Sequence, residues 1–388
     1  MKFLVCPDSF KDSMRSTVVC AQIINAITTV IPQAIAVGIP LSDGGQGFLD
    51  AIATALPATS VTCQVTGALV NNQVEAKYLL IDNNETAIFE LATVAGLELL
   101  ASDQRNPLFT TTYGMGELIL HAINHYPLKK IIIGLGGSAT NDGGVGMLQA
   151  LGVKFTNINN HEIGFGGRAL AEIKHIDLSG IDKRIFELSI EIACDVTNPL
   201  LGVNGATYVY GRQKGADTAA IYELENALTN YSQVLFKLTA QDYSNYPGAG
   251  AAGGTATGLL LLNGKITPGA EVIARYTELE KQISIADYVI SGEGSVDEQT
   301  LYGKTINRIA QLCTKYDKPL LIFCGRSSGR IDYLYQNGVT AIFPISNGAD
   351  DLSNSLLKGR ENLYNCVINV CRLLHQVYNK RLTLVNLK

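Results

Sequence analysis

The stretch KPLLIFCGRSSG, at residues 318–329, decides the fold, because an apolar, β-prone run ends there in a small polar loop. The same unit precedes it as ADYVISGEG (286–294) and follows it as GVTAIFPISNG (338–348), with helical periodicity between the units. Two more units open the chain, as KFLVC (2–6) and IAVGIP (35–40). Strands that alternate with helices in this way predict an α/β fold whose strands form one five-stranded parallel sheet.

The middle of the chain has a different rhythm. Apolar and polar residues alternate over residues 60–91, and Asn-Asn pairs stand where turns would fall, which predicts an antiparallel meander. The segments after it indicate two helices and two further strands, at 114–126, 218–238, 129–135 and 187–195. A mixed α/β domain inserted into the first domain accounts for both patterns, the strand–helix alternation at the two ends of the chain and the meander in its middle. The expected domains are residues 1–60 plus 285–388, and residues 61–284.

Composition narrows the class of protein. The 388 residues are 47% hydrophobic and 17% charged, with a formal net charge of −5 and no block of like charge. We therefore expect neither a nucleic-acid nor a membrane partner. The N-terminal apolar run is too short for a signal peptide, and the eight cysteines are scattered without a C-x-x-C pair. Both features favour a cytoplasmic protein with reduced cysteines.

Polar loops follow the strands repeatedly, at the sheet edge where parallel α/β folds collect their ligands. These loops carry six carboxylates: Asp8, Asp43, Asp142, Asp195, Glu293 and Asp297. Asp195 ends a strongly apolar strand, so it is the preferred general base, while Asp43, Glu293 and Asp297 are the metal candidates. For any one of them, a capped turn is the competing interpretation.

Two glycine-rich loops suggest seats for phosphate. GLGGSATNDGG (134–144) lies between an apolar strand and a helix, and PGAGAAGGTATG (247–258) also precedes an apolar helix. Amide groups at helix starts favour anions, and two such loops suit a nucleotide triphosphate, although Asn141 could simply cap its helix. The predicted nucleotide- and phosphate-binding residues are Gly136, Gly137, Ser138, Asn141, Asp142, Gly143, Gly253, Gly254 and Lys304.

Other chemistries fit the sequence less well. It contains no G-x-x-x-x-G-K-[ST] motif and no G-x-G-x-x-G after the first strand. His121 and His125 have the i, i+4 spacing of a metal pair, but they have no third partner, so an exposed helix face is expected. Lysines beside the loops could neutralise phosphate or hold a substrate carboxylate, or be ordinary surface side chains.

Taken together and in order, eight stretches make the sequence resemble the type I glycerate kinase family. They are PDSFKDSM (7–14), PLSDGGQG (40–47), TTYGMGELI (111–119), GGSATNDGGVGMLQALG (136–152), ACDVTNPLLG (193–202), GRQKGAD (211–217), PGAGAAGG (247–254) and GEGSVDEQTLYGK (292–304). The resemblance covers nearly the whole chain and implies ATP-dependent phosphorylation of D-glycerate with Mg²⁺. It also implies a flavodoxin-like domain interrupted by a second α/β domain.

The hypothesis that follows is direct in-line transfer of the ATP γ-phosphate to a glycerate hydroxyl. The predicted catalytic residues are Asp195, Lys11 and Asp43, and the predicted substrate-binding residues are Asp8, Ser9, Asn198 and Lys214. A kinase for another small hydroxy acid and a non-catalytic nucleotide or organic-acid sensor remain alternatives. The choice between the 2- and 3-hydroxyl stays open, as does a monomer or homodimer.

Overall fold

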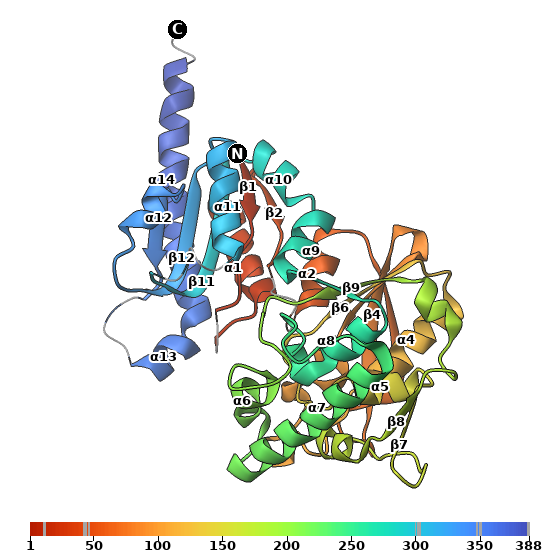
Figure 1. Cartoon of the computed structure of the whole chain (residues 1–388). Helices are drawn as coiled ribbons and strands as arrows, with labels where there is room; N and C mark the ends of the chain where they lie inside the picture. The colour runs from red at the N-terminus through yellow and green to blue at the C-terminus, as the bar shows by residue number, and fades with distance from the viewer. Residues whose placement is uncertain are drawn as a thin grey trace. The chain divides into compact units, whose positions relative to one another are not determined.

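A computed structural model describes residues 1–10, 13–41, 45, 47–298, 300, 304–346, 348 and 351–385, without the side chains of 304, 305 and 380–385. The chain divides into two compact units, each with its own sheet (Figure 1). The first unit comprises Met1–Ser42, Asp50–Pro57 and Ala270–Lys388, and the second comprises Asp43–Leu49 and Ala58–Gly269. The domain bounds expected at 60/61 and 284/285 stay a prediction.

The first unit is built on a five-stranded sheet with the order β13-β12-β11-β1-β2, and all its neighbours are parallel. Its strands are β1 (Lys2–Val5), β2 (Ile35–Gly38), β11 (Tyr288–Val296), β12 (Leu320–Ser327) and β13 (Ala341–Pro344). Numbered along the chain within this sheet, the order is 2-1-3-4-5, the flavodoxin-like order. The predicted α/β fold class and its parallel sheet are confirmed.

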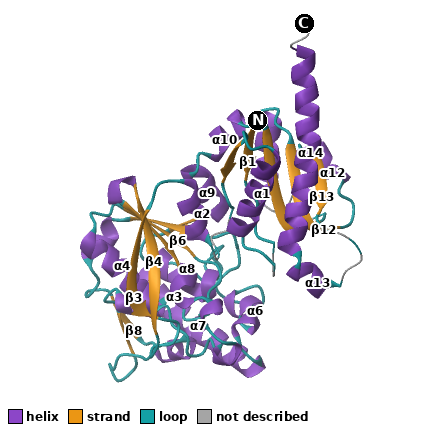
Figure 2. Ribbon diagram, turned by 180° about the vertical axis from the view of Figure 1, so that it is seen from behind, coloured by secondary structure: helices purple, strands orange, loops and turns teal. Residues whose placement is uncertain are grey.

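The helices of this unit cover both faces of its sheet. They are α1 (Ser16–Val30), α2 (Phe48–Ala55), which begins in the second unit, α9 (Gly269–Tyr276), α10 (Leu279–Ile285), α11 (Lys304–Lys315), α12 (Asp332–Gln336), α13 (Leu352–Leu357) and α14 (Gly359–Val385). Helices α1 and α14 lie side by side on one face, in front of the sheet in Figure 2. Val19, Ile23 and Ile27 recur at helical spacing on α1 and are buried with Phe3 and Phe323 of the sheet.

The second unit contains a six-stranded mixed sheet with the order β10-β9-β6-β5-β4-β3. Its strands are β3 (Thr59–Thr66), β4 (Gln73–Ile81), β5 (Thr86–Glu90), β6 (Lys130–Gly134), β9 (Ser189–Ala193) and β10 (Lys265–Thr267). Strands β3, β4 and β5 form the predicted antiparallel meander, whereas β5, β6, β9 and β10 run parallel. The carboxyl ends of these four parallel strands therefore meet at one sheet edge.

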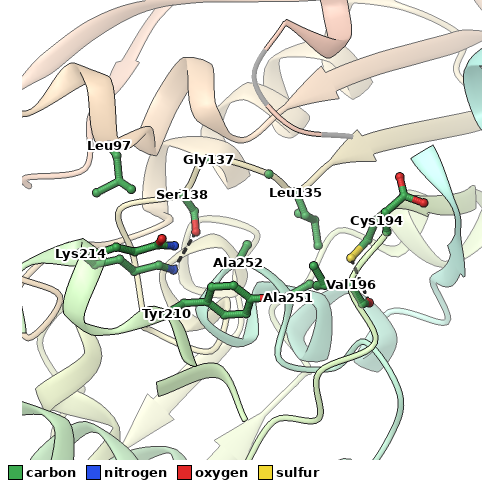
Figure 3. Close-up of a pocket in the computed structure, with 13 residues that line it drawn as sticks. Leu97, Leu135, Gly137, Ser138, Cys194, Val196, Tyr210, Lys214, Ala251 and Ala252 are labelled. Carbon is green, nitrogen blue, oxygen red and sulfur yellow. Dashed lines mark hydrogen bonds between the residues drawn. The ribbon is translucent and has the colours of Figure 1, made fainter. Parts of the chain in front are cut away.

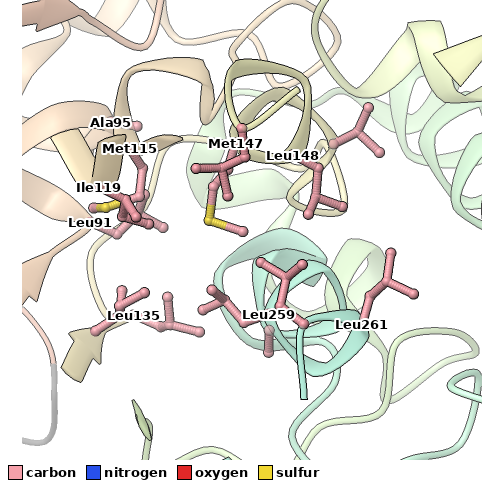
Figure 4. Packing of buried hydrophobic residues seen from close by; sticks show 14 of the residues in the cluster. Leu91, Ala95, Met115, Ile119, Leu135, Met147, Leu148, Leu259 and Leu261 are labelled. Carbon is pink, nitrogen blue, oxygen red and sulfur yellow. The ribbon is translucent and has the colours of Figure 1, made fainter. Parts of the chain in front are cut away.

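Helices and a small hairpin complete this unit. They are α3 (Ala92–Ala95), α4 (Tyr113–His125), α5 (Val145–Ala150), α6 (Ala206–Tyr210), α7 (Thr218–Thr239), α8 (Ala251–Leu261), and β7 (Lys154–Thr156) paired with β8 (His175–Asp177). Six short 3₁₀ turns join them: Asp82–Asn84, Leu97–Leu99, Ser102–Gln104, Gly167–Glu172, Lys183–Glu187 and Arg212–Lys214. Figure 4 shows the core where α3, α4, α5 and α8 bring buried side chains together, including Met115, Met147 and Leu259.

Three smaller expectations can be compared with the structure. All eight cysteines are free thiols, as predicted, and six of them are buried. His125 is exposed, but His121 is half-buried, because its Nδ1 lies 3.0 Å from the hydroxyl of Tyr78 in the sheet beneath α4; the prediction of an exposed pair is wrong for His121. Within the described ranges, no helix has the length and apolar character of a membrane span.

Candidate active site

A pocket of about 200 Å³ lies where the parallel strands of the second unit end. Its walls come from the loops after β6 and β9, from the segment around the Arg212–Lys214 turn, and from the start of α8 (Figure 3). The lining residues are Leu97, Leu135, Gly136, Gly137, Ser138, Cys194, Asp195, Val196, Tyr210, Gln213, Lys214, Ala251 and Ala252. Five of the predicted nucleotide, substrate and catalytic residues thus line this pocket together with apolar side chains.

Lys214 supplies the positive charge of this pocket. Its ammonium Nζ donates to Ser138 Oγ at 2.9 Å and to the Thr140 carbonyl oxygen at 2.6 Å, and the residue is only 2% exposed. Burial lowers the pKa of Lys214 to about 7, and the negative charge of Asp142 opposes this shift. Lys214 was predicted to contact the substrate and Ser138 the nucleotide, and the structure joins the two side chains by a hydrogen bond.

The loop between β6 and α5 presents backbone donors beside Lys214. Gly137 has a φ of +71°, and its carbonyl accepts from the amide of Leu97 at 2.9 Å, which fixes the loop. In the described part of the chain, the amides of Gly136, Gly137 and Ser138 have no acceptor. Consecutive amides of this kind form a concave seat for an anion, so these three predicted positions fit anion binding.

Asp142 lies inside the loop, at 1% exposure, and its carboxylate already has protein donors on both oxygens. Its Oδ2 accepts from the amide of Thr112 at 2.7 Å, the hydroxyl of Thr112 at 2.9 Å and the amide of Gly146 at 3.3 Å. Its Oδ1 accepts from the amide of Gly144 at 3.2 Å. The start of α5 is therefore capped by the chain's own carboxylate, while the phosphate contact of Asp142 stays a prediction.

The neighbouring residues of the loop are similarly enclosed. The side chain of Asn141 is fully buried, and its Nδ2 donates to Thr207 Oγ1 at 3.1 Å. Gly143 donates its amide to the Gly253 carbonyl at 3.0 Å, and a Cβ on Gly253 would lie 2.0 Å from the Thr140 oxygen. The glycines at 143, 253 and 254 therefore allow the two loops to pack backbone against backbone, a requirement separate from ligand binding.

Asp195 is half-buried at the end of β9 and lines the pocket. Its Oδ2 accepts from the amide of Gly269 at 3.1 Å, just beyond β10. Asn198, three residues on, has its amide engaged within the protein: Oδ1 accepts from the Tyr210 hydroxyl at 2.7 Å and Nδ2 donates to the Asn204 carbonyl at 2.8 Å. Asn198 thus holds the Tyr210 side chain, which itself lines the pocket.

The remaining described candidates lie in the first unit, at the carboxyl edge of its own sheet. Asp8 and the exposed Ser9 follow β1, Glu293 lies within β11, and Asp297 follows that strand. Glu293 Oε1 accepts from Thr300 Oγ1 at 2.8 Å, and burial, with the nearby charges of Asp8 and Asp297, raises the pKa of Glu293 to about 7. Among the residues that the structure describes, no three acidic, His or Cys side chains are grouped to hold a metal ion. Lys11, Asp43 and the Lys304 side chain lie outside the described residues.

Comparison with known proteins decides the family. The model of the "Glycerate kinase family" matches residues 3–375. The chain belongs to the glycerate kinase family. It is 39% identical over 375 residues to a glycerate 2-kinase of Escherichia coli (strain K12), covering 96% of this chain and 98% of that protein. It is 40% identical over 371 residues to a glycerate kinase of Bacillus cereus, covering 95% of this chain and 97% of that one.

The fold has a solved relative as well. A crystal structure of a glycerate kinase 2 from Salmonella typhimurium LT2 superposes with a TM-score of 0.82 at 37% identity, covering 98% of this chain and 99% of that one. The resemblance seen in the sequence motifs is therefore confirmed for the family and for the α/β fold class.

Two residues of this family member were missed by sequence reasoning. Glu90 ends β5 and is 4% exposed, and its two carboxylate oxygens accept from the amides of Gly47 and Leu49, each at 3.0 Å. A carboxylate at the end of the apolar run TAIFE was the available signal. Tyr210 reaches the pocket through its contact with Asn198, and nothing in the sequence predicts that contact.

Proposed function

We propose that this chain transfers the γ-phosphate of ATP to a hydroxyl of D-glycerate, giving phosphoglycerate and ADP. Membership of the glycerate kinase family and the names of its relatives support this reaction. The observation in the structure that carries it is the pocket of the second unit, where Lys214, the amides of residues 136–138 and Asp195 line one small space. A cation, amide donors and a carboxylate are the groups that phosphorylation of a hydroxy acid needs.

In the proposed mechanism, the substrate oxygen forms a bond to the γ-phosphorus as the bond between that phosphorus and the β,γ-bridging oxygen breaks. Asp195 accepts the hydroxyl proton, and the amide of Gly269 holds its carboxylate in place. Lys214 and the amides of the β6–α5 loop offset the negative charge of the acceptor acid. The Escherichia coli relative is named a glycerate 2-kinase, so we propose the 2-hydroxyl as the acceptor.

We further propose that Mg²⁺ accompanies the nucleotide. Magnesium takes oxygen ligands and commonly uses one or two carboxylates together with substrate phosphates. Asp8, Glu293 and Asp297 provide donors of this type at the carboxyl edge of the first unit's sheet, although among the described residues no three such side chains are grouped as a ligand set. The ion would neutralise part of the triphosphate charge.

All eight cysteines are free thiols, which supports our proposal of a reducing, cytoplasmic location.

The decisive experiment combines product analysis with a substitution of the base. Phosphorus NMR of the product from D-glycerate and ATP should show a doublet, because phosphorus on the 2-oxygen couples to one proton; a triplet would indicate the 3-oxygen. Asp195→Asn should lower kcat on the order of 10²-fold or more with unchanged circular dichroism and melting. Asp103→Asn, on an exposed turn of the same unit, is the matched control. Wild-type turnover in Asp195→Asn would exclude Asp195 as the base.

A further inference from the structure

We propose that the pocket of the second unit is the acceptor site, which binds a three-carbon hydroxy acid by its carboxylate at Lys214 and Ser138 and leaves the nucleotide phosphates outside. This inference rests on the proposed function, because it assigns one of the two substrates of that reaction to one set of residues. It also changes the sequence-based expectation, in which Gly136, Gly137 and Ser138 bind the nucleotide.

The charges around the pocket match a monoanion. Lys214 is the one cationic side chain among the residues that line it, and Asp195 is the one carboxylate. Asp142 adds a second negative charge close enough to act on Lys214. A triphosphate would bring several negative charges towards these two carboxylates against a single ammonium. A hydroxy acid brings one negative charge to Lys214 and a neutral hydroxyl that Asp195 can accept from.

The donors of the pocket converge on one anionic group. Lys214 Nζ has three N–H groups, and two of them are directed at Ser138 and Thr140, which leaves one for a ligand. Ser138 accepts from Lys214, so its own hydroxyl hydrogen can point at the same ligand oxygen. The amides of residues 136–138 have no acceptor in the described part of the chain. A carboxylate with two oxygens can accept from all of these.

The size and walls of the pocket limit the length of the acid. Its volume is about 200 Å³, whereas typical sites for drug-sized ligands are about 300–1,000 Å³. A space of this size suits a short acid better than a whole adenine nucleotide. Leu97, Leu135, Val196 and Tyr210 provide apolar walls for a carbon chain.

The two ends of the pocket are separate. Figure 3 shows Lys214 and Ser138 on one side and Cys194 and Val196, which flank Asp195, on the other. An acid whose carboxylate contacts Lys214 therefore extends its hydroxyl-bearing carbon towards the end of β9. Tyr210 is held in the wall by its hydrogen bond to Asn198, which fixes the position of its ring beside the carbon chain of the acid.

The experiment separates the two ligands by calorimetric titration. D-glycerate is titrated into enzyme saturated with a non-hydrolysable ATP analogue, and the analogue is titrated into free enzyme. In Lys214→Met we expect the Kd for D-glycerate to rise about 10- to 100-fold, the loss of a charge-assisted contact. The Kd for the analogue should stay within threefold. Lys237→Met, an exposed lysine of the same unit, should change neither value.

Three results in Lys214→Met would overturn the assignment. They are a higher Kd for the ATP analogue with an unchanged Kd for D-glycerate, an equal rise in both Kd values, and no change in either Kd. Should Lys214→Met fail to fold, Ser138→Ala tests the same point, with a Kd for D-glycerate about fivefold higher and an unchanged analogue. Leu97→Ala should raise kcat/KM for a four-carbon hydroxy acid relative to D-glycerate. No change in that ratio would refute the proposal that Leu97 limits the length of the acid. Absence of wild-type turnover of D-glycerate would refute the proposed function itself, whereas turnover combined with a nucleotide defect in the variants refutes only this site.

Discussion

Removal of the Asp142 carboxylate tests whether this residue stabilises the fold or contacts a ligand. Asp142 is 1% exposed and accepts hydrogen bonds from three backbone amides, those of Thr112, Gly144 and Gly146. Asp142→Ala leaves all three amides without their acceptor inside a buried loop. A buried donor that loses its partner costs about 1–3 kcal/mol, so three cost about 3–9 kcal/mol.

For Asp142→Ala we expect a loss of stability at the low end of that range. Burial raises the pKa of Asp142 in spite of the hydrogen bonds that lower it, which means that holding the charge there already costs stability. Removal of the charge recovers part of that cost, so we expect a net loss of about 3–4 kcal/mol. For a domain of this size the melting temperature should fall by roughly 10 °C. Asp142→Asn keeps one acceptor oxygen and should lose less than half as much.

The assay is differential scanning calorimetry of both variants, with circular dichroism at 25 °C as a check on the folded state and a coupled measurement of ADP release. The expected order of melting temperature is wild type, then Asp142→Asn, then Asp142→Ala, with activity falling in the same order. A variant that melts within about 1 °C of wild type and has lost turnover would refute the structural role. It would restore Asp142 as a ligand contact.

Two further predictions concern the first unit and the loop at the pocket. Glu293→Gln should remove a pH dependence of the free energy of unfolding, measured by urea unfolding with EDTA at pH 5 and pH 8. Because the folded pKa of Glu293 is raised from 4.5 to about 7, its contribution to stability is complete below the unfolded pKa and is lost as the pH rises to 7, by at most about 3 kcal/mol. An equal change in stability between the two pH values in variant and wild type would contradict this. Ala252→Gly should raise the free energy of unfolding by about 0.5–1 kcal/mol, because Ala252 has a strained φ of +53°. Gly253→Ala should lower the free energy of unfolding by more than about 2 kcal/mol, because its Cβ would lie 2.0 Å from the Thr140 oxygen. Calorimetric melting temperatures that shift alike in both variants would refute the reasoning.

The architecture was largely predictable because its signals are local. Each strand of the parallel sheet is a short apolar run with a polar loop at its carboxyl end, and the alternation in residues 60–91 carries the meander without reference to the rest of the chain. The parallel edge could also be anticipated, since any residue directly after a parallel strand must lie there. Asp195 and Ser138 were placed in this way, and both line the pocket.

The partners of those residues could not be predicted, because they come from distant parts of the chain. The start of α5 looked like a free anion seat, but its donors are satisfied by Asp142 together with Thr112, which is 30 residues away. Lys214 meets Ser138 across 76 residues. Glycine content signalled close approach of backbone, yet it did not say whether the approaching group would be a phosphate or, as for Gly253, another loop.

The buried carboxylate of Asp142, in the β6–α5 loop, acts on the buried ammonium of Lys214, in the Arg212–Lys214 turn. An isolated ammonium at the depth of Lys214 is costly, and burial accordingly lowers its pKa to about 7. Asp142 is the charge that opposes this shift, so the carboxylate that caps α5 also helps to keep Lys214 protonated. A bound carboxylate acts in the same direction, because it favours the charged lysine and therefore draws a proton to it. The residue that stabilises the loop and the ligand that we place in the pocket thus act on one ammonium group, and this gives a physical reason for a chain to bury an aspartate near the lysine that we propose binds the substrate.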